Sequence, residues 1–401
     1  MNKSFKEFKD RNNLEVFYRS ELNDGEKINK KTEEDEMALA KIQNEKMELG
    51  LVDKGILEVG IDAGNGNLKY CYAIKKGEKV IVKTGYLESN ISLETSDEDG
   101  VLTYINGVGY DFNTTEKVIN KVVRGKDTDE HKGLLYKALI TIHKETKELS
   151  EDNVGYTRFN IVCGCSIDSW NIDNGETVKD KMLEATTLDI IDENESFTLK
   201  IEGLAIQPEC AMGIYGFLKS TLAQLKEQDF LLVDIGNLNV GYVKYQKGFK
   251  RDKLLKVNCN GMATIMTELC EYLNERDIKR RPISEKMLKD YLLDDKKYLD
   301  ERFKDREVII QEYVDSYISD FIQTATKSFK GDLSSSYKIV FIGGGAIALD
   351  RYLHNSVEKV LDVEDYNYST IKLKEDVLFS NAKAFRQRAK KLFVSEVKVG
   401  A

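Results

Sequence analysis

Proline and long apolar runs are what this sequence has least of. The 401 residues contain two prolines, Pro208 and Pro282, so few rigid linkers mark domain boundaries. No run of about 18 apolar residues occurs, which excludes an ordinary membrane-spanning helix. Residues 1–11 are charged rather than apolar, which argues against a secretory signal. We therefore expect a cytoplasmic protein that does not enter a membrane.

Zinc-binding patterns and a basic surplus are missing as well. The six cysteines include no CxxC pair, and the three histidines are scattered, so we interpret Cys163 and Cys165 as buried, reduced thiols rather than metal ligands. Lys and Arg total 60 against 69 Asp and Glu, giving a net charge of -9. This balance disfavours direct DNA binding through a broad basic face, so any action on DNA would require an adaptor.

The first 54 residues differ in composition from the rest. Residues 1–50 carry 10 Lys or Arg and 12 Asp or Glu, and Leu39, Ile42 and Leu49 recur at helical spacing. We expect a partly helical N-terminal extension outside the main fold. A solvated arm is the simpler interpretation, and a contact arm for neighbouring subunits remains the alternative.

Two β-hairpins with glycine and asparagine at their tips dominate the remaining chain. An apolar strand from Ile56 ends at Asp62, and the tip Gly64-Asn65-Gly66-Asn67 leads into a second strand. The pattern returns 172 residues later, where Asp234 is followed by Gly236, Asn237 and Asn239. Five identities in the nine positions from Asp62 to Tyr70 and from Asp234 to Tyr242 predict a structural duplication.

These tips suit phosphate. Glycine and asparagine at a hairpin tip leave backbone N–H groups unobstructed, and such groups form a nest for phosphate oxygens. The two aspartates that begin the tips, Asp62 and Asp234, can hold Mg²⁺ through its water shell. Lys69, just past the first tip, can supply a positive charge to the phosphates. Taken alone, one such tip is more simply an ordinary hairpin turn; the duplication favours the phosphate site.

Three further segments are candidates for the same site. Gly343, Gly344 and Gly345 follow an apolar strand and allow close backbone approach to a ring or sugar, or merely a tight turn into a helix. Gly261 precedes a predicted helix and either lines the site or only begins that helix. Glu209 follows Pro208 between a predicted strand and helix, so it either orients a hydrolytic water or complements the helix dipole.

The other expected elements alternate strands and helices. We predict strands at 159–162, 197–206 and 338–342, and helices at 131–147, 211–225, 262–275, 284–304, 307–329 and from Ser380, which would act as N-cap.

Taken in order, these motifs resemble the actin superfamily. Residues 62–69 look like its first phosphate motif, with a lysine placed as in ParM-type plasmid-segregation actins, and 234–237 look like its second. Residues 207–213 resemble the connecting segment that carries the family's water-orienting Glu, here Glu209. Residues 341–346 resemble the adenosine motif, and 380–385 are similar to the closing helix of ParM-like proteins.

The resemblance implies an α/β, actin-like fold of two related domains, each a mixed sheet flanked by helices, around a nucleotide cleft. The boundaries we expect are an extension over 1–54, domain I over 55–227 with an insert at about 76–130 and a closing helix at 380–401, and domain II over 228–379 with a helical subdomain at about 265–305.

The function it implies is a filament-forming ATPase or GTPase. It would bind ATP or GTP with Mg²⁺, with Glu209 and Asp234 catalytic, and segregate plasmid DNA through a ParR-like DNA-binding adaptor. Asn239 and Gly241 stand where the family pattern usually has Thr and Asp, which leaves a non-hydrolysing scaffold open. A small-molecule kinase of the same superfamily is the other alternative, whereas too few residues follow the closing helix for a heat-shock-type chaperone.

Overall fold

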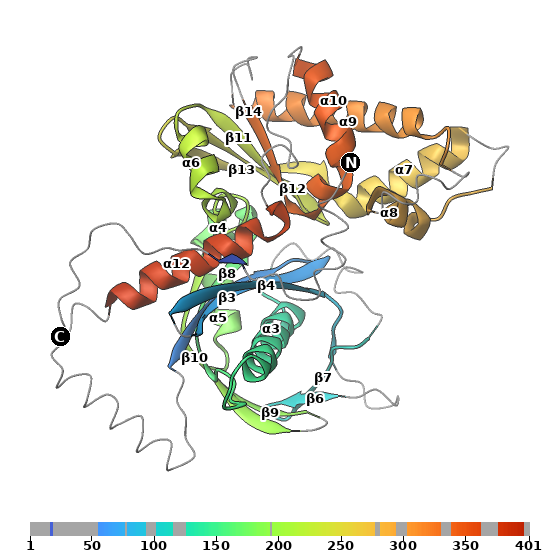
Figure 1. Cartoon of the computed structure of the whole chain (residues 1–401). Helices are drawn as coiled ribbons and strands as arrows, with labels where there is room; N and C mark the ends of the chain where they lie inside the picture. The colour runs from blue at the N-terminus through green and yellow to red at the C-terminus, as the bar shows by residue number, and fades with distance from the viewer. Residues whose placement is uncertain are drawn as a thin grey trace.

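The fold is built on two β-sheets with helices on both faces of each. A computed structural model describes residues 17–18, 55–76, 78–93, 102–114, 126–192, 195–276, 281–293, 303–329, 338–361 and 376–396. The two sheets lie in separate lobes, and helix α12 (Ser380–Glu396) lies at their junction (Figure 1).

The first sheet has ten strands in the described part of the chain. Their order is β1-β4-β3-β2-β8-β10-β9-β6-β7-β5, and β8 pairs in parallel with both β2 and β10. The strands are β1 (Phe17–Tyr18), β2 (Ile56–Ala63), β3 (Asn67–Lys76), β4 (Lys79–Glu88), β5 (Ser92–Leu93), β6 (Thr103–Ile105), β7 (Val108–Asp111), β8 (Arg158–Cys165), β9 (Thr187–Ile191) and β10 (Ser196–Pro208).

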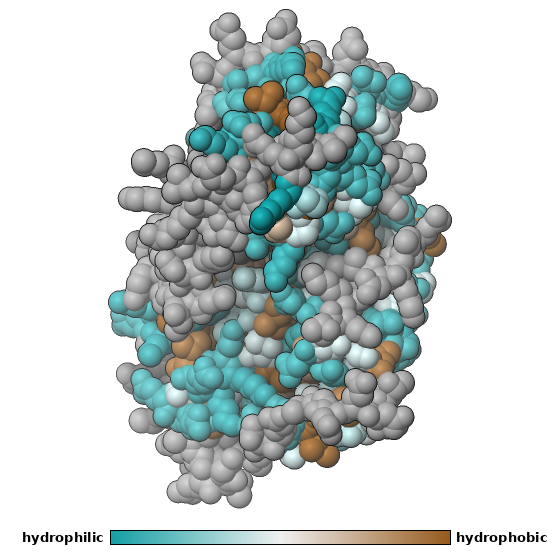
Figure 2. Space-filling view, turned by 90° about the vertical axis from the view of Figure 1, so that its right-hand side faces the viewer, coloured by the Kyte–Doolittle hydropathy of each residue, from teal (hydrophilic) through white to brown (hydrophobic). Residues whose placement is uncertain are grey.

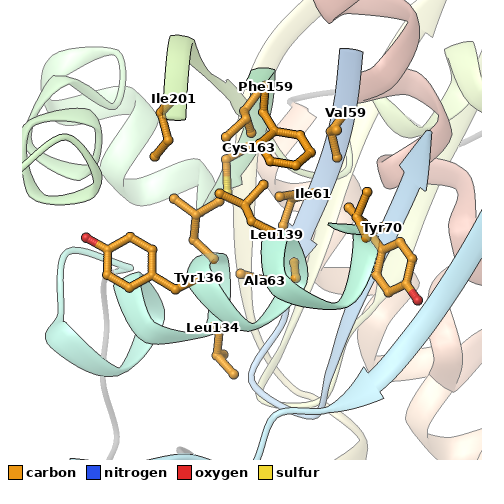
Figure 3. Packing of buried hydrophobic residues seen from close by; sticks show 14 of the residues in the cluster. Val59, Ile61, Ala63, Tyr70, Leu134, Tyr136, Leu139, Phe159, Cys163 and Ile201 are labelled. Carbon is orange, nitrogen blue, oxygen red and sulfur yellow. The ribbon is translucent and has the colours of Figure 1, made fainter. Parts of the chain in front are cut away.

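Helix α3 (Asp129–Glu148) covers one face of this sheet. Leu139 of this helix lies beside Ile61 of β2 and Phe159 of β8 (Figure 3), and Leu134 and Val59 belong to the same buried cluster. The shorter helices α4 (Ile167–Asp173) and α5 (Glu176–Met182) follow β8. The predicted helix at 131–147 is confirmed, since the periodic apolar positions are the ones that are buried.

Helix α12 covers the opposite face. Successive residues of a strand point to opposite faces, so Gly60 of β2 faces away from α3. A Cβ on Gly60 would collide with the carbonyl oxygen of Ala382 and the backbone nitrogen of Arg386, so backbone lies directly on backbone there. Phe385 and Ala389 pack with Val162 of β8 in the same layer.

The second sheet has four strands in the described residues, ordered β13-β12-β11-β14, with β11 and β14 parallel. One face packs on α7 to α10, and the other packs on the 3-10 helix η2 and on α6. The bounds are β11 (Phe230–Ile235), β12 (Asn239–Gln246), β13 (Lys250–Asn260), β14 (Lys338–Ile342), η2 (Gly213–Gly216), α6 (Lys219–Lys226), α7 (Met262–Arg276), α8 (Glu285–Leu293), α9 (Glu307–Phe329), α10 (Gly343–Leu361) and η4 (Val377–Phe379).

Several local predictions need correction. The single helix expected at 211–225 is wrong: η2 and α6 are separate, because Phe217 and Leu218 are extended. Gly213 and Gly216 weaken the helix there, and Gly216 also lies too close to Ser380 for a side chain.

Two helix starts also differ from expectation. Ser380 was expected as the N-cap of the last helix, but it is already helical, and its hydroxyl donates to the carbonyl oxygen of Val377. Helix α10 begins at Gly343 itself, so the three glycines form its first turn rather than a turn ahead of it. The helix predicted at 284–304 corresponds to α8; residues 294–302 lie outside the described residues, and the prediction is wrong at 303–304, which form a turn.

The N-terminal extension is described only at Phe17–Tyr18, which pair antiparallel with Val82 and Ile81 of β4. The helix predicted within 33–49 lies outside the described residues. The expectation that the extension lies outside the main fold is therefore wrong at Phe17–Tyr18, which add a strand at the edge of the first sheet.

Candidate functional site

The two predicted hairpins have the same pairing register. Asp62 pairs with Lys69 across β2 and β3, and Asp234 pairs with Gly241 across β11 and β12, seven residues on in both cases. A Cβ on Gly64 would lie 2.8 Å from the carbonyl oxygen of Asn67, and one on Gly236 would lie 2.9 Å from that of Asn239. The predicted repetition of the hairpin is confirmed: the two hairpins share their pairing register and the close backbone contact that requires glycine at each tip.

The two tips meet each other. A Cβ on Gly66 of the first tip would lie 3.0 Å from the Cβ of Asn237 in the second. The charge of Asp62 helps to raise the pKa of Asp234, so the two carboxyl groups act on one another. The structure therefore brings both aspartates to one place, although the chain separates them by 172 residues.

Asp62 is held by two lysines. Its side chain is buried, with the ammonium group of Lys69 3.2 Å from Oδ2 and that of Lys126 3.8 Å from Oδ1. Burial acts to raise the pKa of Asp62, but the charges of Lys69 and Lys126 outweigh it, and the pKa lies below its usual value. Asp62 is therefore an anion at neutral pH.

Glu209 lies directly after the last residue of β10, where its N–H donates to the carbonyl oxygen of Cys165. A Cβ on Gly164 would lie 2.7 Å from its Oε1, so the glycine of the neighbouring strand leaves room for the carboxyl group. Burial raises the pKa of Glu209 to about 7 against the opposing charge of Lys126. A carboxyl group with that pKa exchanges protons readily near neutral pH.

The helix-dipole interpretation of Glu209 is wrong. Residues 209–212 form a turn rather than the first turn of a helix. The side chain of Glu209 instead faces Lys126 and Asp62, so it belongs to the cluster at the hairpin tips.

Two residues of this cluster were not predicted. The ammonium group of Lys126 bonds to Glu209 Oε1, and burial, which acts to lower its pKa, is outweighed by the charges of Glu209 and Asp62. His131 of α3 places Nε2 3.1 Å from Oδ1 of Asn65 in the first tip, and burial lowers its pKa to about 3. His131 is therefore neutral at physiological pH.

Asp234 lies at the centre of the second half of the site. Asn381 of α12 donates from Nδ2 to its Oδ2 at 2.9 Å. Burial is the main cause that raises its pKa. Gly343 has φ +90°, and a Cβ there would touch Oδ1 of Asp234, so the position accepts only glycine.

The remaining predicted glycines lie around the second tip. A Cβ on Gly261 would lie within 2.6 Å of the backbone of residues 237–239, so this glycine lies against the tip and does more than begin α7. Gly345 packs against Ile235 and Met262, while Gly344 has open space except for Leu378 at 3.7 Å. The glycine run thus joins β14 to α10 beside Asp234.

The polar groups present fit a phosphate and Mg²⁺. Nδ2 of Asn237 is a buried donor without a hydrogen-bond partner among the described residues, and Asn239 is exposed on the same tip. Among the described residues no group of three or more His, Cys, Asp or Glu could hold a metal by itself. Mg²⁺ binds one or two carboxylates and completes its coordination with water and phosphate oxygens. Asp62 and Asp234 can supply the two carboxylates.

The described cysteine side chains are buried, as expected. Cys71, Cys163, Cys165, Cys210 and Cys270 are free and buried. Burial raises the thiol pKa of Cys163 and Cys165 to about 12, so both are protonated.

On the face drawn in Figure 2, the coloured residues are mainly hydrophilic, with small, separate hydrophobic groups among them. None of the described helices is long and apolar enough to span a bilayer.

No family model matches this chain, and no curated protein sequence matches it. Solved structures do match. The crystal structure of the actin-like protein Alp7A matches 85% of this chain and 97% of its own, with a TM-score of 0.58 and 14% identity. A 15-stranded ParM filament from Clostridium botulinum matches 84% and 100%, with a TM-score of 0.55 and 16% identity. An AlfA filament bound to AMPPNP matches 85% and 99%, with a TM-score of 0.51 and 17% identity. These similarities show an actin-like fold, which confirms the fold class expected from the sequence.

Proposed function

We propose that this actin-like chain binds ATP or GTP with Mg²⁺ where its two hairpin tips meet, and hydrolyses it to control assembly into filaments. The observation that carries the proposal is the shared cluster of Asp62, Glu209 and Asp234 at two tips of identical register. The side-chain amide of Asn237 is a buried donor that lacks an acceptor among the described residues, and a phosphate oxygen would supply that acceptor.

Each group has a role that its surroundings support. Gly64, Asn65, Gly66 and Asn67 of the first tip and Gly236, Asn237 and Asn239 of the second would hold phosphate oxygens, with Lys69 adding charge. Asp62 and Asp234 would hold Mg²⁺ through water, which lowers the charge of the phosphates for attack. Glu209 would orient the attacking water by accepting a hydrogen bond from it. Gly261 and Gly343–Gly345 would lie against sugar and base.

Self-association is the second part of the proposal. Two of the similar solved structures are filaments, of ParM and of AlfA, and the AlfA filament is bound to AMPPNP. A net charge of -9 disfavours direct DNA binding, so plasmid DNA would be reached through a ParR-like adaptor in the cytoplasm.

Light scattering and phosphate release, recorded together on the whole chain, test both parts. We expect assembly on addition of ATP or GTP with Mg²⁺, followed by phosphate release. Glu209→Ala should slow phosphate release by about 10²-fold or more and leave assembly intact. Glu202→Ala is a matched control, because Glu202 lies on β10, seven residues before Glu209, with a similarly covered side chain, but bonds to Arg158.

The outcomes separate the alternatives. Equal phosphate release from the Glu209→Ala variant and the unaltered chain would remove Glu209 from this role. Assembly without any phosphate release would indicate a non-hydrolysing scaffold. A chain that stays monomeric with every nucleotide and phosphorylates a metabolite would be a kinase, and the proposal would be wrong.

A further inference from the structure

Lys126 is a cation at the site that neither hairpin supplies. It lies just before α3, whose N-cap is Thr128, and its side chain is 6% exposed. Its ammonium group bonds to Oε1 of Glu209 and lies 3.8 Å from Oδ1 of Asp62. One lysine therefore joins the carboxyl group after β10 to the carboxyl group at the end of β2.

A second lysine nearby does not contact the carboxyl groups at the hairpin tips. Lys132, six residues later on α3, bonds to Asp129 and Glu184, whose side chains are about half exposed. Lys132, whose own side chain is 13% exposed, thus pairs with two carboxylates at the surface, whereas Lys126 pairs with carboxylates of the proposed site.

Lys126 competes with water for Glu209. Its ammonium group takes Oε1, so a water oriented by Glu209 has only Oε2 and the remaining lone pair of Oε1. The partner of Lys126 on its other side, Asp62, already has Lys69 at 3.2 Å. Asp62 therefore remains paired if Lys126 leaves, whereas both carboxyl oxygens of Glu209 then become available to water.

From these contacts, and resting on the proposed function, we propose that Lys126 senses the γ-phosphate, the terminal phosphate of a bound triphosphate. When a nucleoside triphosphate binds, Lys126 turns from Glu209 to the terminal phosphate oxygens and frees Oε1 for the attacking water. A diphosphate ends at its β-phosphate and has no γ-phosphate, so Lys126 stays on Glu209. Lys126 exchanges one anionic partner for another, and its flexible four-carbon stem allows the movement.

The test compares the affinities of triphosphate and diphosphate. Isothermal titration calorimetry of the whole chain with AMPPNP, ADP, GMPPNP and GDP, each with Mg²⁺, measures them without turnover. Lys126→Met should weaken the affinity for the better-bound triphosphate analogue at least about tenfold, because a charge-assisted hydrogen bond is lost. The affinity for the corresponding diphosphate should fall less than about threefold. Lys126→Arg should restore most of the preference for the triphosphate analogue over the diphosphate, and Lys132→Met should change neither affinity.

An equal loss of both affinities, or no loss, would overturn the inference and leave the proposed function standing. Failure of the unaltered chain to bind any of the four nucleotides would overturn the proposed function and the inference with it. If Lys126→Met does not fold, a structure of the unaltered chain with Mg²⁺ and the bound analogue decides. Lys126 within about 3.2 Å of a terminal phosphate oxygen supports the inference, and Lys126 still on Glu209 refutes it.

Discussion

Acidification should destabilise this protein through one histidine at the first hairpin tip. Burial lowers the pKa of His131 from 6.5 to about 3 in the folded chain, so the unfolded chain binds its proton first as the pH falls. The stability that neutral His131 provides is complete above pH 6.5 and is lost as the pH falls from 6.5 towards 3. Between pH 7 and pH 5 the free energy of unfolding should fall by about 2 kcal/mol from this group alone.

Urea unfolding at pH 7, 6 and 5, followed by circular dichroism, measures the loss. His131→Gln retains an amide that can donate to Asn65 but does not titrate, so its stability should fall by about 2 kcal/mol less than that of the unaltered chain over this range. His354→Gln is the control. His354 lies 3.4 Å from Glu358, with its side chain 30% exposed, and its replacement should leave the pH dependence nearly unchanged.

The result that refutes this reasoning is an identical pH dependence for His131→Gln and the unaltered chain. His131 would then titrate in the folded protein as it does in the unfolded one. The side chain would have to be hydrated, contrary to its complete burial against Thr128 and Asn65.

Three further changes address α12, the site and the sheet edge. Asn381→Leu removes the hydrogen bond to Asp234 and should weaken Mg²⁺-dependent nucleotide binding about 10- to 100-fold, measured by magnesium titration at fixed nucleotide; an unchanged magnesium midpoint would contradict it. Gly60→Ala places a methyl group against the backbone of α12 and should lower stability by about 1–3 kcal/mol or more in thermal unfolding, whereas an unchanged melting temperature would show that the helix moves freely. Removal of residues 1–54 uncovers the edge of β4 and should increase sedimentable aggregate in the absence of nucleotide; equal solubility of both chains would argue against a protective role.

The hairpins could be predicted because their signals are local. Alternating apolar residues, a Gly/Asn tip and a leading aspartate determine strand, turn and register within nine residues, and the chain repeats them. The long amphipathic helix α3 could be predicted for the same reason, because its buried apolar residues recur at helical spacing within one continuous segment.

Contacts between distant segments could not be predicted in this way. Lys126 is one lysine in a charged stretch, and its partner Glu209 is 83 residues away. Ser380 resembles an N-cap by residue type, but η4 ahead of it already supplies helical backbone, so its hydroxyl bonds elsewhere. The helix expected at 211–225 is interrupted where Gly216 meets Ser380, a contact that only the folded chain contains.

Helix α12 has a consequence for synthesis. A ribosome completes β2 and β8 long before residues 380–396 emerge, so the face of the first sheet around Gly60 and Val162 stays uncovered for most of translation. Asn381, which bonds to Asp234, arrives with the same helix. A nascent chain therefore cannot complete the site before it has closed its first lobe, and truncated products would carry an exposed apolar face that quality control can recognise.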